Sequence, residues 1–427
     1  MVALKSMALW PQVRSPRFAL LLLTVAFCLV RARDQPSIDV GIGGTTAAVV
    51  PGDILLAALA LVSVVAIANR GLKRELWLPV AAAAVFSLIL VGSAAANGAA
   101  AFVSGIKVTE LTALGLGAAL FLTSRRQLEA LVDLLLVFTL AADAIGAVRF
   151  LTSGGRQASF LGEHDFAALA TLPLLYGLAV VFSGGSRGRA AIAMGAGGVG
   201  CILGAALASL LGLYLGTLAL ILVAWRRRWV TRTRLVVAAG VIAVVTAGTL
   251  GLRAGELGFL QSWFGKPATR PGQYAASWSQ RLIYAYVGGR VFLAHPGFGT
   301  GWYGELPPKE FTAYLPAARR RFSDQPPNYF PPADKPFIPQ QTWDQILYEL
   351  GLVGAAAMVG TLAGLFRSAV RAARRATSVA ASLPVAWLAG SIGALAGEGL
   401  FGGTPLAATF WLVGGVVLAL SSVTFAE

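Results

Sequence analysis

Arginine residues border the longest polar stretch of this chain, where an anionic ligand could bind. Arg281 and Arg290 enclose a segment of aromatic and aliphatic residues at helical spacing, and Arg156 follows an earlier apolar run. A guanidinium fork matches two phosphate oxygens at once, so arginines that face a membrane-embedded cavity would suit a lipid-linked pyrophosphate. A basic surface can also contact anionic lipid headgroups, and this simpler interpretation fits the run at residues 319–321.

Few side chains near these arginines could accept a proton. Asp344 stands in the first turn of a predicted helix, where its carboxylate could act as a base or could simply favour the helix macrodipole. The chain has two histidines. His295 precedes a Pro-Gly turn, which also suits a structural role, and His164 opens a helix between two acidic residues, where capping explains it as well as catalysis does.

Composition places the chain among membrane proteins. Hydrophobic residues make up 57% of the sequence, charged residues only 12%, and the mean hydropathy is +0.73, which is far outside the range of soluble globular proteins. The formal net charge of +15 comes from short basic clusters between apolar runs. This distribution is typical of topology determinants and not of a surface that binds nucleic acid. Cys28 and Cys201 each lie within an apolar run, so neither a disulfide nor a metal site is indicated.

Twelve apolar stretches can cross a hydrocarbon layer of about 30 Å, some of them with local thinning. They predict an all-α polytopic membrane protein with nine spans in residues 1–252, a large polar loop with short amphipathic helices at 253–340, and three spans in 341–427. If successive spans cross the membrane in alternating directions, the short basic clusters all lie on the same side as both termini. The positive-inside rule assigns this side to the cytoplasm. The large loop is therefore predicted to be extracytoplasmic. The predicted spans are residues 16–32, 53–69, 77–95, 101–122, 128–151, 166–182, 190–206, 210–224, 235–252, 342–366, 382–400 and 406–421.

Residues 190–224 are predicted to form a tight hairpin of two short spans. The basic clusters at both ends of this segment should lie on the same side of the membrane, because basic residues favour the cytoplasmic side. The chain should therefore turn back near residues 208–212. The glycines of the first span favour close helix packing.

Ionisable residues inside the predicted spans are few. Such groups are costly in lipid, so each is a candidate for function, or for pairing where it lies near a membrane boundary. They are Glu110, Glu129, Asp133, Asp143 and Glu398.

Two strings border the polar loop. The first starts at Arg281, passes through an amphipathic segment and ends with HPGFGTG at residues 295–301, and the second is QQTWDQILYELGLVG at residues 340–354. Together they resemble the O-antigen ligase and O-antigen polymerase superfamily of bacterial membrane glycosyltransferases, of which this chain would be a divergent member. In topology the resemblance covers most of the chain, because that family has about a dozen spans and one large periplasmic loop in its C-terminal third.

The resemblance implies transfer of a glycan from a polyprenyl-pyrophosphate donor to a saccharide or lipid-saccharide acceptor at the bacterial inner membrane, in the synthesis of cell-envelope polysaccharide. Neither a nucleotide sugar nor a metal nor another cofactor is expected, and the partners are the two substrates, the lipid bilayer and proteins of envelope assembly. Periplasmic arginines bind the donor pyrophosphate in that family, a role that Arg281 and Arg156 would take here, with Arg290 as a further candidate. The candidates for stacking on sugar faces, which could also be ordinary interfacial aromatics, are Trp302, Tyr303 and Trp343.

Two departures from the family pattern bear on the mechanism. The family's histidine-asparagine pair at the end of the loop corresponds to Gln340 and Gln341, and a glutamine cannot act as a general base near neutral pH. The family's arginine at the outer turn of the short hairpin corresponds to Leu210. Asp344, about one helical turn after Gln340, is the predicted substitute base, and His295 is another candidate. A catalytically inactive scaffold subunit and a transporter of lipid-linked sugars are the alternative functions.

Overall fold

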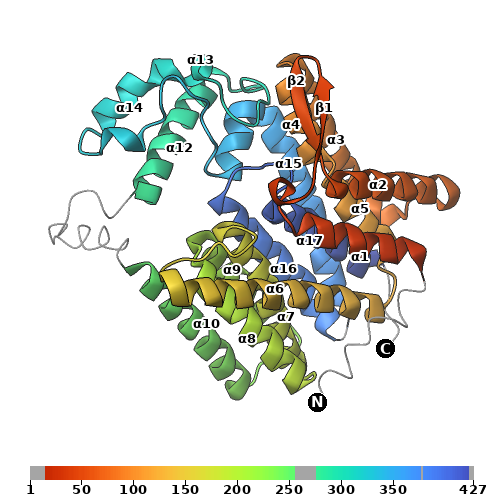
Figure 1. The fold of residues 1–427 in the computed structure, drawn as a ribbon. Helices are drawn as coiled ribbons and strands as arrows, with labels where there is room; N and C mark the ends of the chain where they lie inside the picture. The colour runs from red at the N-terminus through yellow and green to blue at the C-terminus, as the bar shows by residue number, and fades with distance from the viewer. Residues whose placement is uncertain (1–14, 255–275, 377, 423–427) are drawn as a thin grey trace.

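The computed structural model describes residues 15–254, 276–376 and 378–422, and residues 255–275 of the predicted polar loop lie outside these ranges. Within the described chain, ten helices are long and apolar enough to cross a membrane, which confirms the predicted class of helical membrane protein (Figure 1). The helices in these ten segments are α2 (Pro51–Arg70), α3 (Arg74–Ala96), α4 (Ala99–Thr109) joined to α5 (Thr112–Phe121), α6 (Arg125–Ser153), α7 (Glu163–Ser183), α9 (Leu207–Arg226), α10 (Arg232–Leu252), α15 (Thr342–Arg375), α16 (Val379–Ala394) with the 3-10 turn η7 (Leu395–Gly397), and α17 (Pro405–Ser422).

The other two predicted spans form helices that are shorter or more polar. Helix α1 (Pro16–Cys28) has 13 residues, and the arginines and glycines of α8 (Arg187–Gly204) lower its hydropathy. Ala205 ends α8 in a left-handed conformation with a φ of 43°. The predicted hairpin between α8 and α9 therefore exists, but its turn lies a few residues earlier than predicted. A Cβ on Gly197 or Gly200 would press on Ala170 of α7, so these glycines do allow the close packing that the sequence predicted.

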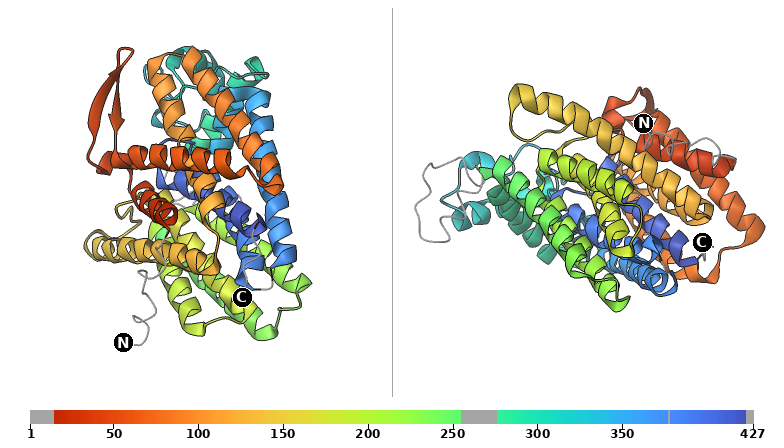
Figure 2. Two further views of the ribbon diagram at one scale, coloured as in Figure 1. Left: turned by 90° about the vertical axis from the view of Figure 1, so that its right-hand side faces the viewer. Right: turned by 90° about the horizontal axis from the view of Figure 1, so that it is seen from below.

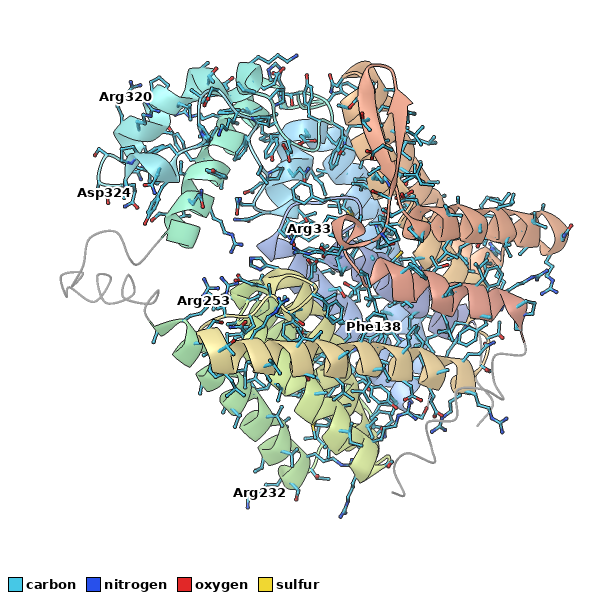
Figure 3. All side chains as sticks on the ribbon, in the orientation of Figure 1. Arg33, Phe138, Arg232, Arg253, Arg320 and Asp324 are labelled. Atoms are coloured by element: carbon cyan, nitrogen blue, oxygen red, sulfur yellow. The ribbon has the colours of Figure 1, made fainter. Side chains whose placement is uncertain are left out.

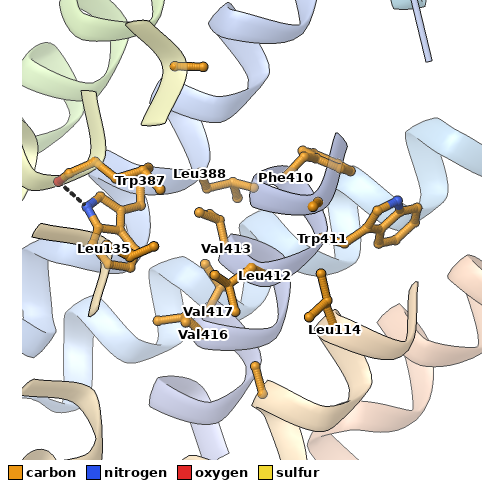
Figure 4. Close-up of a cluster of buried hydrophobic side chains, with 14 of the residues drawn as sticks. Leu114, Leu135, Trp387, Leu388, Phe410, Trp411, Leu412, Val413, Val416 and Val417 are labelled. Atoms are coloured by element: carbon orange, nitrogen blue, oxygen red, sulfur yellow. Dashed lines mark hydrogen bonds between the residues drawn. The ribbon is translucent and has the colours of Figure 1, made fainter. Parts of the chain in front are cut away.

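Helix α17 lies at the centre of the bundle. In Figure 4, Phe410, Trp411 and Val413 of this helix lie among side chains from neighbouring helices, including Leu114 of α5 and Trp387 of α16. The indole N–H of Trp387 donates to a backbone carbonyl of α7 over 2.9 Å. A helix that is apolar on every side is stable only when other helices surround it, which explains the nearly complete burial of α17.

A small second core supports the polar segment between α10 and α15. This segment contains α12 (Ala276–Ala294), α13 (Pro308–Phe311) and α14 (Leu315–Arg321), with the 3-10 turns η5 (Thr312–Tyr314) and η6 (Pro327–Tyr329). A helix before His295 is therefore present, as predicted, and it stops there because the Pro-Gly pair that follows cannot continue it. We call the side of the bundle that carries α12 to α14 the loop end (Figure 1). The main side chains of this core are Ile283, Val287, Phe311, Phe337 and Tyr348.

A short hairpin at the loop end was not predicted from the sequence. After the 3-10 turn η3 (Ala32–Asp34), strands β1 (Ile38–Ile42) and β2 (Thr45–Val49) pair in an antiparallel manner. Gly43 and Gly44 connect them with positive φ angles of 54° and 85°, as a tight hairpin turn requires. The hairpin projects from the helical bundle in the left view of Figure 2.

The two strings that border the polar loop pack directly on each other. Gly351 has φ 61° and ψ −160° and interrupts the hydrogen-bond ladder of α15. The turn after α12 supplies replacement partners. The N–H of Leu352 donates to the carbonyl of Pro296 over 2.8 Å, and the N–H of Thr300 donates to the carbonyl of Tyr348 over 3.0 Å. The break in α15 thus fixes the position of α12, which carries Arg281.

Replacing Gly351 with alanine is expected to destabilise the fold by about 2 kcal/mol or more, because alanine is strained at this φ and its Cβ would collide with the backbone of Gly297. The midpoint of thermal unfolding in detergent measures this loss. Gly360→Ala on the same helix is the matched control, since a Cβ there would have only Ala82 within 4 Å, at 3.8 Å. Equal unfolding midpoints for the two variants would contradict the role given to the break.

Candidate functional site

Arg281 and His164 meet at the loop end, although 117 positions separate them in the sequence. Nη2 of Arg281 donates to the carbonyl of Gly397 over 2.7 Å and lies 3.3 Å from Nε2 of His164. Because a guanidinium group only donates hydrogen bonds, Nε2 must be the acceptor, and a neutral imidazole then carries its proton on Nδ1. Among the described residues, Nδ1 is buried without a hydrogen-bond partner.

Four guanidinium groups act electrostatically on this histidine. The positive charges of Arg31, Arg156, Arg253 and Arg281 are all close enough to act on His164. We call these four residues the arginine cluster. They come from four separate segments, which follow α1, precede α7, follow α10 and form part of α12. Figure 3 labels Arg253 at the end of α10, near the loop end.

Carboxylates and backbone carbonyls hold the arginine cluster in place. The Nη2 atom of Arg31 lies 2.7 Å from Oδ2 of Asp165, whose side chain is fully buried. The Nη2 atom of Arg156 lies 2.6 Å from Oε2 of Glu163, and Arg253 donates to a backbone carbonyl at the turn after α8 over 3.1 Å. Guanidinium groups held in this way suit an anionic ligand such as a phosphate.

Glu398 completes the site on the side of α16. Burial raises the pKa of its carboxyl group to about 8, and the charge of Asp165 adds to the shift, while Arg31 and Arg281 oppose it. Its Oε2 atom is buried without a hydrogen-bond partner among the described residues. Burial and the nearby charge of Asp165 therefore favour the protonated form of this carboxyl group.

The thermal stability of the protein is expected to fall as pH rises from about 5 to about 9, in part through Glu398. Its pKa is raised from an ordinary value of 4.5, so the folded state holds the proton more tightly and loses that advantage as pH passes through 8. Glu398→Gln keeps a neutral side chain of the same shape and should flatten this part of the profile. Parallel profiles of the unfolding midpoint for wild type and variant would show that Glu398 does not titrate in this range.

The structure brings together two of the three arginines predicted to bind the donor. Arg156 and Arg281 both lie in the arginine cluster. Arg290 lies exposed on α12, where its guanidinium is 5.4 Å from the ring centre of Tyr286 and donates to the hydroxyl of that residue. It has no recorded contact with His164.

Among the described residues, no recorded hydrogen bond or ion pair joins the predicted bases to the arginine cluster. Asp344 is partly buried in the first turn of α15, and no hydrogen bond or ion pair joins it to the cluster in the ranges that the structure describes. His295 is exposed at the end of α12. Gln340 is partly buried just before α15, two residues from Thr342, whose hydroxyl donates to the carbonyl of Glu398. Of the described imidazoles, His164 is the one inside the cluster.

The aromatic candidates differ in how accessible they are. Trp302 is fully buried, and its indole N–H donates to Ser104 over 3.3 Å, so its ring has no free face in this conformation. Trp343 is partly buried against the main core. Tyr303 lies beside a cavity of about 480 Å³. Two further residues in the wall of this cavity, Phe401 and Gly402, follow closely after Glu398, so the cavity adjoins the site.

The carboxylates inside the spans have separate environments. Asp133 pairs with Arg189 over 2.6 Å, so the pairing interpretation fits it. One oxygen of Asp143 and one of Glu110 are buried without a partner among the described residues. In the same ranges, no three His, Cys, Asp or Glu side chains are grouped so that they could hold a metal ion.

The fold and the site define a class: a helical membrane protein with four arginines near one histidine at the loop end. Compared with known protein families and with curated proteins, the chain matches no family model and no curated sequence.

Proposed function

We propose that this protein transfers a glycan from a polyprenyl-pyrophosphate carrier to a hydroxyl group of an acceptor saccharide, on the extracytoplasmic side of a bacterial inner membrane. The arginine cluster around His164 is the observation that carries the proposal. A diphosphate that is esterified at both ends, to a lipid and to a sugar, has two negative charges. The guanidinium groups of the cluster can donate hydrogen bonds to the oxygens of such a diphosphate.

The arginine cluster would act on the leaving group. In the transfer step, the acceptor oxygen attacks the anomeric carbon of the donor, and the bond from that carbon to the diphosphate oxygen breaks. The polyprenyl diphosphate leaves with the electron pair of this bond and gains a negative charge. Preorganised guanidinium groups stabilise such a developing charge without the reorganisation that water would need.

His164 is the proposed acceptor of the hydroxyl proton. In the described structure, Arg281 occupies its Nε2 lone pair. A bound diphosphate would compete for the Arg281 guanidinium, because an anionic oxygen accepts a stronger hydrogen bond than a neutral nitrogen does. Nε2 would then become free, and the negative charge of the donor would offset the arginine charges that disfavour a protonated imidazole. The imidazole would therefore accept a proton only when the donor is in place, which would couple donor binding to activation of the acceptor.

The cavity beside Tyr303 is the proposed site of the acceptor sugar. Sugar sites combine aromatic rings with polar groups at fixed positions. The backbone of Tyr303 is held beside the cavity, because its amide N–H donates to Oε2 of Glu349 over 3.0 Å. The polar side chains that line the cavity are Asn97, Ser104, Lys107 and Glu305.

The experiment is a transfer reaction in proteoliposomes that contain only the purified protein, a polyprenyl-diphosphate-linked oligosaccharide and an acceptor saccharide. The proposal predicts a product that contains both sugars. A scaffold subunit would give no product, and a transporter would move the donor across the bilayer without changing it. Either result, obtained with folded protein, would refute the proposal.

A further inference from the structure

A second basic cavity lies between α3 and α15, far from the arginine cluster. Its volume is about 340 Å³, and its wall contains Arg74, Arg367 and Arg371. The path along α15 from Thr342, next to the site, to Arg371 is roughly 40 Å at 1.5 Å per residue. This cavity therefore belongs to the opposite end of the bundle, and its function does not depend on the proposed transfer reaction.

The charge inside this cavity is not balanced. The Nη1 atom of Arg371 is buried and has no hydrogen-bond partner among the described residues. Glu75 also lines the cavity, but the described side chains show no ion pair within 4.0 Å between it and any of the three arginines. A buried guanidinium nitrogen without a partner is costly, so an anion in the cavity that accepts its hydrogen bond would be stabilising.

The arrangement of the side chains suits a phosphate group. Arg367 and Arg371 are four residues apart, so they lie on one face of α15, and the buried hydroxyl of Ser368 lies in the same wall. Arg74 is the first residue of α3 and approaches from the other wall. Three guanidinium groups and one hydroxyl can donate to several oxygens of one phosphate, as the fork geometry of arginine favours.

The surroundings of the cavity indicate a lipid rather than a soluble anion. Trp77 and Phe366 flank it in sequence and are 59% and 58% exposed. Exposed aromatic residues at the ends of membrane helices are typical of the headgroup region of a bilayer. Leu78 and Pro79 give the cavity an apolar wall beside the arginines. A cavity that is basic on one side and apolar on the other matches a phosphate headgroup with its acyl chains.

We infer that the cavity between α3 and α15 binds the phosphate group of an anionic phospholipid from the leaflet opposite the loop end. Arg371, through its unpartnered Nη1 atom, supplies the central hydrogen bonds, and Arg367 and Arg74 enclose the headgroup. The lipid would fill the gap between the two helices and hold them together at this end of the bundle.

Native mass spectrometry of the detergent-solubilised full chain tests this inference, with phosphatidylglycerol as the probe and phosphatidylcholine as the neutral comparison. Wild type should retain phosphatidylglycerol in preference to phosphatidylcholine. Arg371→Gln should bind phosphatidylglycerol about tenfold more weakly, the effect of losing one charge-assisted hydrogen bond. Arg232→Gln is the matched control, because Arg232 is exposed at the start of α10 and lies outside the cavity wall. Its binding should equal that of wild type.

Three results would overturn the inference. The first is equal binding of phosphatidylglycerol by wild type and Arg371→Gln. The second is equal weakening in Arg371→Gln and Arg232→Gln, which would indicate only bulk charge. The third is complete displacement of the lipid by inorganic phosphate at equal concentration, which would assign the cavity to a soluble anion. If Arg371→Gln fails to fold, Arg74→Gln is the deciding variant, because Arg74 is exposed and its replacement should not disturb the fold. Several-fold weaker binding of phosphatidylglycerol by Arg74→Gln would support the lipid site, and unchanged binding would reject it.

Discussion

Arg281→Ala is expected to lower glycan transfer by a factor of roughly 100 to 1,000, the usual effect of removing one preorganised donor from a developing anion. Arg281 donates a hydrogen bond toward His164, so its loss removes both a phosphate-binding group and the partner of the proposed base. Arg281→Lys should restore only part of the activity, because an ammonium group keeps the charge but not the fork. The initial rate of transfer in proteoliposomes measures both variants.

Arg320→Ala is the matched control for this variant. Arg320 is an exposed arginine of the same polar segment, on α14, at a distance from α7 (Figure 3). Its loss removes the same charge and should change the rate by less than about twofold. If Arg281→Ala remains folded and retains activity within a few fold of wild type, the assignment of the pyrophosphate site to the arginine cluster is wrong.

His164→Gln is expected to lower the turnover number by a factor of roughly 100 to 10,000, the range for loss of a general base. Glutamine can still hydrogen-bond to Arg281 but cannot take up a proton near neutral pH. The KM for the donor should change little, because the four arginines remain. Steady-state kinetics with varied donor concentration separates the two quantities.

Asp344→Asn is the decisive comparison for the base. The structure records no contact between Asp344 and the arginine cluster in the described ranges, so this variant should keep its turnover number within a few fold of wild type. If activity is lost in Asp344→Asn and kept in His164→Gln, the base is Asp344, as the sequence predicted, and not His164.

Local chemistry explains why the helical class and the helix before His295 could be predicted. Hydropathy alone marks a helix such as α2, and the Pro-Gly pair after His295 ends α12 whatever surrounds it. The hairpin of β1 and β2 was missed because its strands are short and largely exposed, so they lack the alternation that reveals a half-buried strand.

The arginine cluster could not be derived in full, because it is assembled from segments far apart in the chain. In the sequence, Arg31 is recognisable only as a residue at the end of an apolar run, and Arg253 only as a residue at the border of the polar loop. Their meeting depends on how α1, α7, α10 and α12 pack together. A usable signal did exist at His164, because a histidine between two acidic residues at the start of a span has to find charged partners.

Asp344 illustrates the limit of reasoning from helix periodicity. The spacing correctly placed it one turn after Gln340, in the first turn of α15. Periodicity states which residues share a face of a helix, but not which neighbour that face meets. The neighbour of the arginine cluster on this side is Glu398, which lies after α16 and was predicted only as a boundary carboxylate.

The most direct test of the central claim is the stoichiometry of the reaction catalysed by the purified protein alone. Polyprenyl diphosphate release and glycan attachment to the acceptor are measured in the same proteoliposomes over time. The proposed mechanism predicts that one polyprenyl diphosphate appears for each glycan transferred, and that both signals disappear in Arg281→Ala. Folded wild-type protein that produces neither product from a donor and acceptor presented on the loop side would contradict it.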